Sequence, residues 1–296
     1  AGRLNAATDG HDLVRVLRTA LPFEKPFARS GEPALRGTTL PSEARFLLFS
    51  GGYNNWLDGD LLLSAVERLL AADPRVHYVS TGGAIEGNVS RVFERFRAGA
   101  QASPHRDRYH FLGWVEHQRL EDLCLEADAG VACDTWTLEG RFGARTRALT
   151  WLWAGMRAVL SDPSDLTAEL HRDGLVRALP RGSADDLAAA LAQALALGRL
   201  PDAEAAARRE RLTTHYGPAA RFAPLLDWAA DPRPAPDRLN GEVRNPLADW
   251  QRRALRATQR EPALAELLDR LEGSRLVRLW LARRPRLRQI IRGLRR

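Results

Sequence analysis

A segment with closely spaced arginines is the strongest candidate for chemistry in this sequence. It reads DTWTLEGRFGARTR over residues 134–147 and lies between a predicted strand and a predicted helix. A helix amino terminus presents unpaired N–H groups and partial positive charge, which suit a phosphate. Arg145 and Arg147 add fork-shaped donors in the first turn of that helix. The segment therefore predicts a phosphate site; the alternative is an ion-pair network of both arginines with Glu139 and Asp134.

Two glycines follow the first predicted strand. Gly51 and Gly52 would let a ligand approach the backbone closely, and the next helix offers a second amino terminus. A plain tight turn explains the pair equally well. The sequence has no GxGxxG pattern and no P-loop, so dinucleotide-fingerprint and P-loop functions are unsupported. It also lacks GxSxG and HExxH, which argues against hydrolase and metalloprotease activities.

Asp58-Gly59-Asp60 resembles the D-x-D motif of metal-dependent sugar transferases. It stands where a helix is predicted to begin, and an aspartate at that position caps the helix by accepting from its free N–H groups. We favour capping over metal binding, with ligand contact by Asp58 as a third interpretation. No metal site is predicted.

Tryptophans occur on three of the predicted loops beside these motifs. Trp56, Trp114 and Trp136 could stack on a base or a sugar, or could anchor the loops that carry them. Both interpretations stay open.

The elements that must position these residues alternate between strand and helix. Short apolar runs alternate six times with segments of helical periodicity, which predicts parallel βαβ units with right-handed crossovers. The fold class is therefore α/β: a single doubly wound, Rossmann-like parallel sheet of about six strands, with a helical C-terminal extension. In such sheets ligands bind beyond the carboxyl ends of the strands, where the strand order switches. The predicted strands are 44–50, 75–81, 108–114, 129–134, 157–162 and 175–180, and the predicted helices are 60–72, 89–99, 120–128, 144–155, 166–174, 183–198, 202–216 and 218–230.

Composition is that of a globular protein with a basic end. The chain has 296 residues, 45% hydrophobic and 27% charged, and no apolar run long enough to cross a membrane or act as a signal peptide. The net charge is +7, yet residues 275–296 hold nine arginines and no acid, so residues 1–274 carry 7 − 9 = −2. We therefore expect no nucleic-acid partner. Cys124 and Cys133 are predicted to be buried free thiols.

Four segments are predicted along the chain. Residues 1–41 form a connector or remnant, 42–230 the Rossmann-like domain, 231–243 a Pro-rich linker and 244–296 a basic helical tail. On a helical wheel the end of the tail, 275–296, is basic and amphipathic and includes Trp280. Such a helix suits an anionic membrane surface, or docks on the protein itself with a solvated basic face; RNA contact is a weaker third interpretation.

Three motifs in order carry a family resemblance. They are LFSGGYNNWLDGDLLLSAVERL, FLGWVEHQRLEDLCLEADAGVAC and LEGRFGARTRALTWLWAGMRAVLSD. Together they resemble the C-terminal, donor-binding half of GT-B glycosyltransferases, of the retaining, family-4-like group, over about residues 42–230. The resemblance implies a nucleotide-diphosphate sugar as donor substrate, no cofactor, and no metal in principle.

The resemblance also assigns roles to individual residues. Glu139 would contact the donor sugar, Arg145 and Arg147 would hold the diphosphate, and Trp114 and Val115 would lie against the base. Glu139 and Arg145 are the candidate catalytic residues. The candidate donor-binding residues are Gly51, Gly52, Asn54, Trp56, Asp58, Gly82, Gly83, Trp114, Val115, Arg141, Phe142, Thr146 and Arg147.

Two departures from the family pattern accompany the resemblance. Thr150 stands where the family has a second acid, and Arg157 stands where it has a proline. The residues before the first strand are also too few for an acceptor-binding Rossmann domain, so we expect the chain to need a separate N-terminal half.

The resemblance implies transfer of a glycosyl group to a bacterial polysaccharide, glycolipid or similar acceptor, in the cytoplasm or peripherally at the inner face of the membrane. A non-catalytic nucleotide- or sugar-binding module, or an unrelated doubly wound protein such as a sugar-nucleotide epimerase, are the alternatives.

Overall fold

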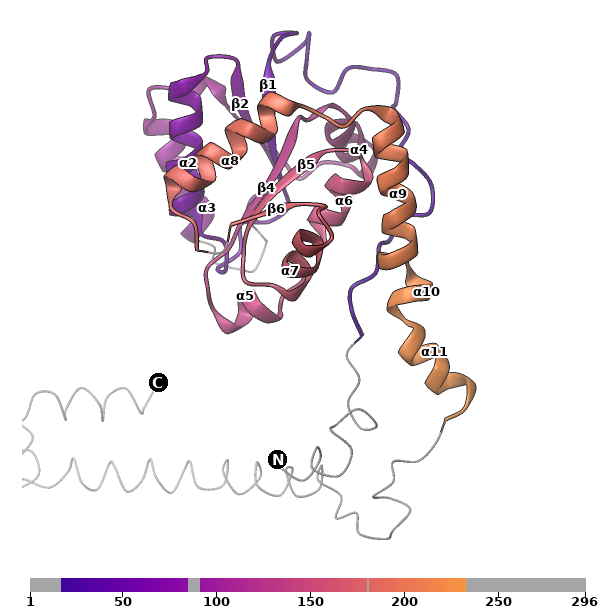
Figure 1. The fold of residues 1–296 in the computed structure, drawn as a ribbon. Helices are drawn as coiled ribbons and strands as arrows, with labels where there is room; N and C mark the ends of the chain where they lie inside the picture. Colours follow the sequence, from indigo (N-terminus) through magenta and orange to yellow (C-terminus); the bar gives the residue numbers. More distant parts are fainter. Residues whose placement is uncertain (1–16, 85–90, 180, 233–296) are drawn as a thin grey trace, which may run out of the picture. The chain divides into compact units, whose positions relative to one another are not determined.

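The computed structural model describes residues 17–84, 91–179 and 181–232 (Figure 1). One compact unit spans Val16–Ala230. The predicted basic tail, residues 233–243 of the predicted linker and the first sixteen residues lie outside the described residues. The predicted membrane contact of the tail is therefore not addressed by the structure.

A six-stranded parallel sheet forms the centre of the described unit, as the sequence predicts. Its strand order is β3-β2-β1-β4-β5-β6, so the order reverses between β1 and β4. Every residue of β2 and β4 is buried, as expected for strands covered on both faces, whereas the edge strand β6 has two residues, one of them exposed. The strands are β1 (Arg45–Ser50), β2 (Val76–Thr81), β3 (Tyr109–Gly113), β4 (Ala129–Cys133), β5 (Arg157–Ser161) and β6 (Arg177–Ala178).

Helices cover both faces of the sheet (Figure 1), and the buried apolar side chains form two hydrophobic cores. The core that holds Leu47 and Phe49 of β1 is closed by α2 (Gly59–Ala72), α3 (Arg91–Ala102) and α8 (Ala184–Leu197). The core that holds Phe46 and Leu48 is closed by α4 (His117–Glu126), α6 (Arg147–Trp153), α7 (Asp165–Arg172) and α9 (Asp202–Tyr216). Alternate β1 residues therefore point to opposite faces, the period of two that a strand imposes.

Three helical details differ from the sequence prediction. The helix predicted over 144–155 begins at Arg147, so Arg145 precedes it. A short helix, α5 (Leu138–Phe142), forms inside the segment predicted as a loop, because the Thr137 side chain accepts from the Gly140 N–H and caps it. The helix predicted over 218–230 is interrupted at Phe222, giving α10 (Pro218–Arg221) and α11 (Ala223–Ala230). A 3-10 turn, η1 (Arg106–Arg108), leads into β3.

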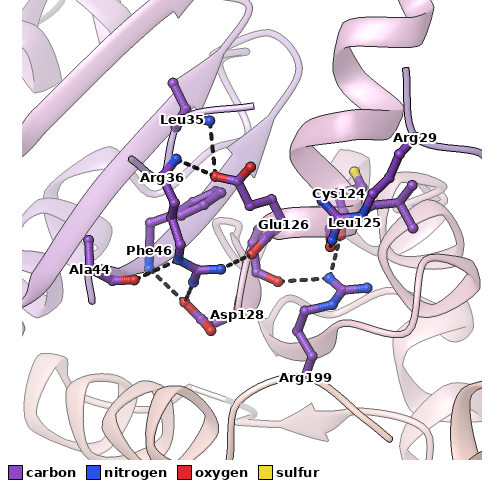
Figure 2. Close-up of polar contacts among 11 residues, drawn as sticks. Arg29, Leu35, Arg36, Ala44, Phe46, Cys124, Leu125, Glu126, Asp128 and Arg199 are labelled. Carbon is purple, nitrogen blue, oxygen red and sulfur yellow. Dashed lines mark hydrogen bonds and ion pairs between the residues drawn. The ribbon is translucent and has the colours of Figure 1, made fainter. Parts of the chain in front are cut away.

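The described part of the predicted connector is irregular but anchored at the amino-terminal edge of the sheet. Glu126, at the end of α4, accepts the backbone N–H groups of Leu35 and Arg36 at 2.9 and 2.6 Å (Figure 2) and that of Ala34 at 2.6 Å. One buried carboxylate thus satisfies three backbone donors that have no strand to pair with. This explains how a segment without helix or strand packs as part of the domain.

The Arg36 side chain completes this anchor. Its guanidinium donates to the carbonyls of Ala44 and Glu126 at 2.7 and 2.6 Å, forms an ion pair with Asp128, and lies 5.2 Å from the ring centre of Phe46 (Figure 2). Asp128 in turn accepts from the Phe46 N–H at 2.8 Å. The cation is fully partnered, so its role is to tie the connector to the starts of β1 and β4.

The two cysteines are buried free thiols, as predicted, and burial raises the pKa of Cys124 to about 12. In the described ranges no helix is long and apolar enough to cross a membrane.

Candidate functional site

The carboxyl ends of β1, β2 and β3 are joined by glycines. The Gly51 N–H donates to Thr81 at 3.2 Å, and the Gly82 N–H donates to Gly113 at 2.6 Å. A side-chain carbon added at Gly82, where φ is +83°, would lie 2.4 Å from the carbonyl oxygen of Gly51. Only glycine permits the Gly82 backbone to approach the Gly51 carbonyl this closely. The ends of β1, β2 and β3 are therefore in direct backbone contact with one another.

The loops after β1 and β4 are joined across the point where the strand order reverses. Leu57 and Asp134 form an antiparallel bridge, the Asp58 N–H donates to Cys133 at 2.9 Å, and the Thr135 N–H donates to Trp56 at 2.7 Å. The sequence motifs around residues 51–58 and 134–147 therefore meet at the position where ligands bind in open α/β sheets.

Arg147 lies at this edge, against the glycine turn. A side-chain carbon at Gly51 would be 3.5 Å from the guanidinium carbon of Arg147, and the same guanidinium lies 4.8 Å from the ring centre of Phe49. Burial lowers the pKa of Arg147 below its usual range. Within the described residues no carboxylate forms an ion pair with it. The site thus presents a half-buried cation without a carboxylate partner.

Arg145 has a different environment, although only one residue separates the two. Its side chain is 6% exposed, forms an ion pair with the buried Asp134 and lies 5.7 Å from the ring centre of Trp56. Of the ion pairs considered as an alternative in the sequence analysis, the one between Arg145 and Asp134 therefore forms. Glu139 takes part in no ion pair within the described ranges, so the four-residue network considered as the alternative does not form there.

Two aromatic residues of the site were not predicted from the sequence. Phe49 supports the Arg147 guanidinium, and the buried Tyr53 hydroxyl bonds to the Tyr78 hydroxyl at 2.9 Å and to Ser80 at 2.8 Å. Burial raises the pKa of Tyr53 to about 12, so the hydroxyl stays neutral near Arg147. The signal available in the sequence was the pair of aromatic residues flanking the glycines in FSGGY.

The other predicted residues of the segment lie on or beside α5. Glu139, Arg141 and Phe142 are exposed, Phe142 to 82%, and Thr146 is exposed at the start of α6 without a side-chain capping bond. Glu139 is therefore accessible from solvent on a short helix that follows the loop over the switch point. The Glu139 side chain is thus accessible for the predicted contact with a sugar.

The remaining candidates occupy the neighbouring loops. Trp114 follows β3, is 64% exposed, and donates to the Ala84 carbonyl at 3.2 Å. Val115 is partly buried against the core, Gly52 and Gly83 are buried, and Asn54 is half-buried. Trp136 is partly exposed, and the Arg181 guanidinium lies 4.9 Å from its ring centre.

Asp58 is a helix cap. Its carboxylate accepts from the Leu61 N–H at 3.0 Å at the start of α2, as favoured from the sequence. Within the ranges that the structure describes, no group of three or more His, Cys, Asp or Glu side chains is arranged to hold a metal ion.

Comparison with known proteins supports the fold. No family model and no curated protein matches the sequence. Among solved structures, a UDP-forming alpha,alpha-trehalose-phosphate synthase from Burkholderia vietnamiensis is similar, with 20% identity and a TM-score of 0.50 over 64% of this chain and 45% of that one. HepE from Anabaena, solved with UDP and glucose, gives 15% identity and a TM-score of 0.49 over 63% and 48%.

The similarity to the Burkholderia enzyme is one of fold: this chain shares the Rossmann-like α/β architecture of part of that synthase, which agrees with the predicted resemblance at the level of the fold. This chain spans less than half the length of that synthase.

Proposed function

We propose that this chain is the donor-binding half of a nucleotide-sugar-dependent glycosyltransferase. The observation that carries the proposal is the Arg147 guanidinium, which lies beside Gly51 at the switch point without a carboxylate partner among the described residues. A cation in this position attracts a multiply charged anion, and guanidinium groups form charge-assisted hydrogen bonds with phosphate oxygens.

The proposed chemistry is electrostatic. In glycosyl transfer from a nucleotide-diphosphate sugar, the bond from the sugar to the diphosphate breaks and negative charge develops on the departing phosphate oxygens. Arg147 would stabilise that charge without a metal ion, because a preorganised cation in a partly dry site needs little rearrangement. The second cation, Arg145, is already neutralised by Asp134, so we assign it mainly to holding the loop over β4 in place.

Glu139 and Trp114 define where the rest of the donor would lie. The exposed Glu139 carboxylate is proposed to accept hydrogen bonds from sugar hydroxyls. Trp114, with Val115 behind it, is proposed to contact the base by stacking. The acceptor, a polysaccharide, glycolipid or similar molecule, would be held by a separate domain. Cytoplasmic location and attachment to an anionic membrane through 275–296 belong to the same proposal.

Titration of the full 296-residue chain tests the donor site. UDP, GDP and dTDP are compared by calorimetry with the matching monophosphates and nucleosides; UDP is included because the Burkholderia relative is named as UDP-forming. We expect at least one diphosphate to bind 10-fold or more tightly than its monophosphate, because the second phosphate adds a charge-assisted contact. Equal affinity for diphosphate, monophosphate and nucleoside would contradict the proposal.

A non-catalytic nucleotide- or sugar-binding module is the second candidate. Thr150 favours it, because this half-buried residue of α6 stands where the resembled family has a second acid. Both candidates predict diphosphate binding. Assaying turnover with a nucleotide sugar, in the presence of the acceptor-binding half, separates them, since a binding module leaves the sugar on its diphosphate.

A further inference from the structure

A second cationic site lies at the opposite end of the sheet. A pocket of about 220 Å³ opens at the starts of β5 and β6, between these strands and the helices α8 and α9. It lies at the amino-terminal edge, whereas Gly51 and Arg147 lie at the carboxyl edge. The lining residues are Arg157, Ala158, Val159, Gly174, Leu175, Val176, Arg177, Ala190, Gln193, Ala194, Leu197 and Arg208.

Three arginines from three elements meet in this pocket. Arg157 begins β5, Arg177 begins β6 and Arg208 comes from α9. Arg157 Nε donates to the Gly198 carbonyl at 2.9 Å, and Arg208 Nη1 donates to the Met156 carbonyl at 2.7 Å. Each of these two guanidiniums is thus fixed by one backbone bond and keeps other N–H donors for a ligand.

Acidic side chains are absent from the pocket lining in the described part of the chain. No aspartate or glutamate lines the pocket, and none forms an ion pair there with Arg157, Arg177 or Arg208. The pKa of Arg208 falls to about 10, chiefly through burial and then through repulsion by Arg157 and Arg211, with Glu204 opposing. Arg157 and Arg208 therefore repel each other in the pocket, and a bound anion would relieve that repulsion.

Other buried arginines show how this chain normally compensates such a charge. Arg145 pairs with Asp134, and Arg221 pairs with Glu169 at 2.8 Å. Arg199, which forms no ion pair with a carboxylate among the residues described, instead donates to the carbonyls of Cys124, Ala127 and Ala154. Among the described residues, the pocket arginines form no ion pair, and Arg157 and Arg208 each donate to only one backbone carbonyl.

We propose that this pocket binds a small phosphomonoester. Arginines from three separate elements line the pocket, and arginine forks suit the geometry of phosphate oxygens. Leu175, Val176 and Leu197 provide apolar surface for a short organic group, and the volume admits little more. The site is separate from the proposed donor site and does not depend on it.

The test uses glycerol 3-phosphate and inorganic phosphate as probes, with acetate and chloride at equal ionic strength. Binding is followed by NMR on the full chain carrying Arg147→Gln, so that the carboxyl-edge site does not contribute. We expect saturable shifts of the Gly174, Val176 and Arg177 amides with both phosphates, and none with acetate or chloride.

Variants localise the binding. Arg157→Gln combined with Arg177→Gln should weaken phosphate affinity at least 10-fold. Arg209→Gln removes one positive charge on α9 outside the pocket lining, as Arg177→Gln does at the pocket, and should leave the affinity within 2-fold. Arg177→Gln alone, at an exposed position, should weaken the phosphate affinity about 3-fold. This single variant keeps the test valid if the double variant misfolds. Absence of saturable shifts up to 20 mM phosphate, or equal weakening by Arg209→Gln, would overturn the proposal.

Discussion

Two arginines stack on phenylalanines at opposite ends of the same strand. Arg36 lies 5.2 Å from the ring centre of Phe46 near the start of β1, and Arg147 lies 4.8 Å from that of Phe49 near its end. At the amino end the guanidinium also has Asp128 and two carbonyls. At the carboxyl end no carboxylate of the described chain pairs with it.

The difference separates a structural cation from a binding cation. Where the chain supplies the counterion, desolvation of the arginine is offset within the fold, and the contact holds segments together. Arg147 has no such ion pair among the described residues, and attraction to Asp162 offsets only part of the effect of burial, so a bound anion can offset the rest. We therefore expect substitutions at the anchor formed by Arg36, Glu126 and Asp128 to reduce stability, and substitution of Arg147 to reduce affinity instead.

The largest expected effect is at the amino-edge anchor. Glu126→Ala leaves the N–H groups of Ala34, Leu35 and Arg36 without an acceptor in a buried site, and each such group costs about 1–3 kcal/mol. We expect a loss of about 4 kcal/mol in the free energy of unfolding, measured with urea. Glu116→Ala, an exposed control at the other end of α4, should change it by less than about 0.5 kcal/mol. Similar values for the two variants would contradict the anchoring role.

Arg145→Gln tests whether the neighbour of Arg147 at the carboxyl edge is a structural cation. Removing this guanidinium leaves Asp134, 5% exposed, without its cation. Breaking a buried pair in this way costs about 3 kcal/mol of unfolding free energy. Arg141→Gln, on the exposed side of α5, should be nearly neutral in the same denaturation experiment. A stable Arg145→Gln protein that had lost nucleotide binding would instead assign Arg145 to the ligand.

The smallest expected effect comes from a histidine pair on β2 and β3. His77 Nδ1 lies 3.1 Å from His110 Nε2, and burial, with His110 and Arg108, lowers the pKa of His77 to about 4. The unfolded chain, with a pKa near 6.5, then binds more protons than the folded one between about pH 4 and 6.5. Stability is therefore full above pH 6.5 and falls as the pH decreases through this window.

Partial solvent screening limits the loss between pH 7 and pH 5 to about 1 kcal/mol. Urea denaturation at the two pH values measures it, and His77→Gln should reduce the difference. A wild-type protein more stable at pH 5 than at pH 7 would contradict the assignment.

The sheet was predictable because its signals are local. Apolar runs such as RFLLFS and VHYVST end at glycines, and the alternation with helices allows few topologies. The sixth strand was overestimated, since LVRALP forms only two paired residues at the sheet edge, where neighbouring hydrogen bonds are fewer. Cap positions such as Asp58 were also predictable, because a cap depends on residues within one helical turn.

The division of roles between Arg145 and Arg147 was not predictable in the same way. Both follow the same glycine-containing segment, and only the tertiary structure places Asp134 next to one and Gly51 with Phe49 next to the other. The anchor of residues 34–36 on Glu126 was missed for the same reason, because the partners are about 90 residues apart. The α5 helix was missed because five residues containing a glycine give too little periodicity.

The most direct test of the central claim is the affinity of the full chain for its best nucleoside diphosphate, measured for Arg147→Gln and for Arg97→Gln. Arg97 is exposed on α3 and provides the same change of charge away from the site. We predict that Arg147→Gln weakens binding 10- to 100-fold, about 1.4–2.7 kcal/mol, with no loss of thermal stability, and that Arg97→Gln binds as the wild type does. Wild-type affinity in Arg147→Gln would contradict the account.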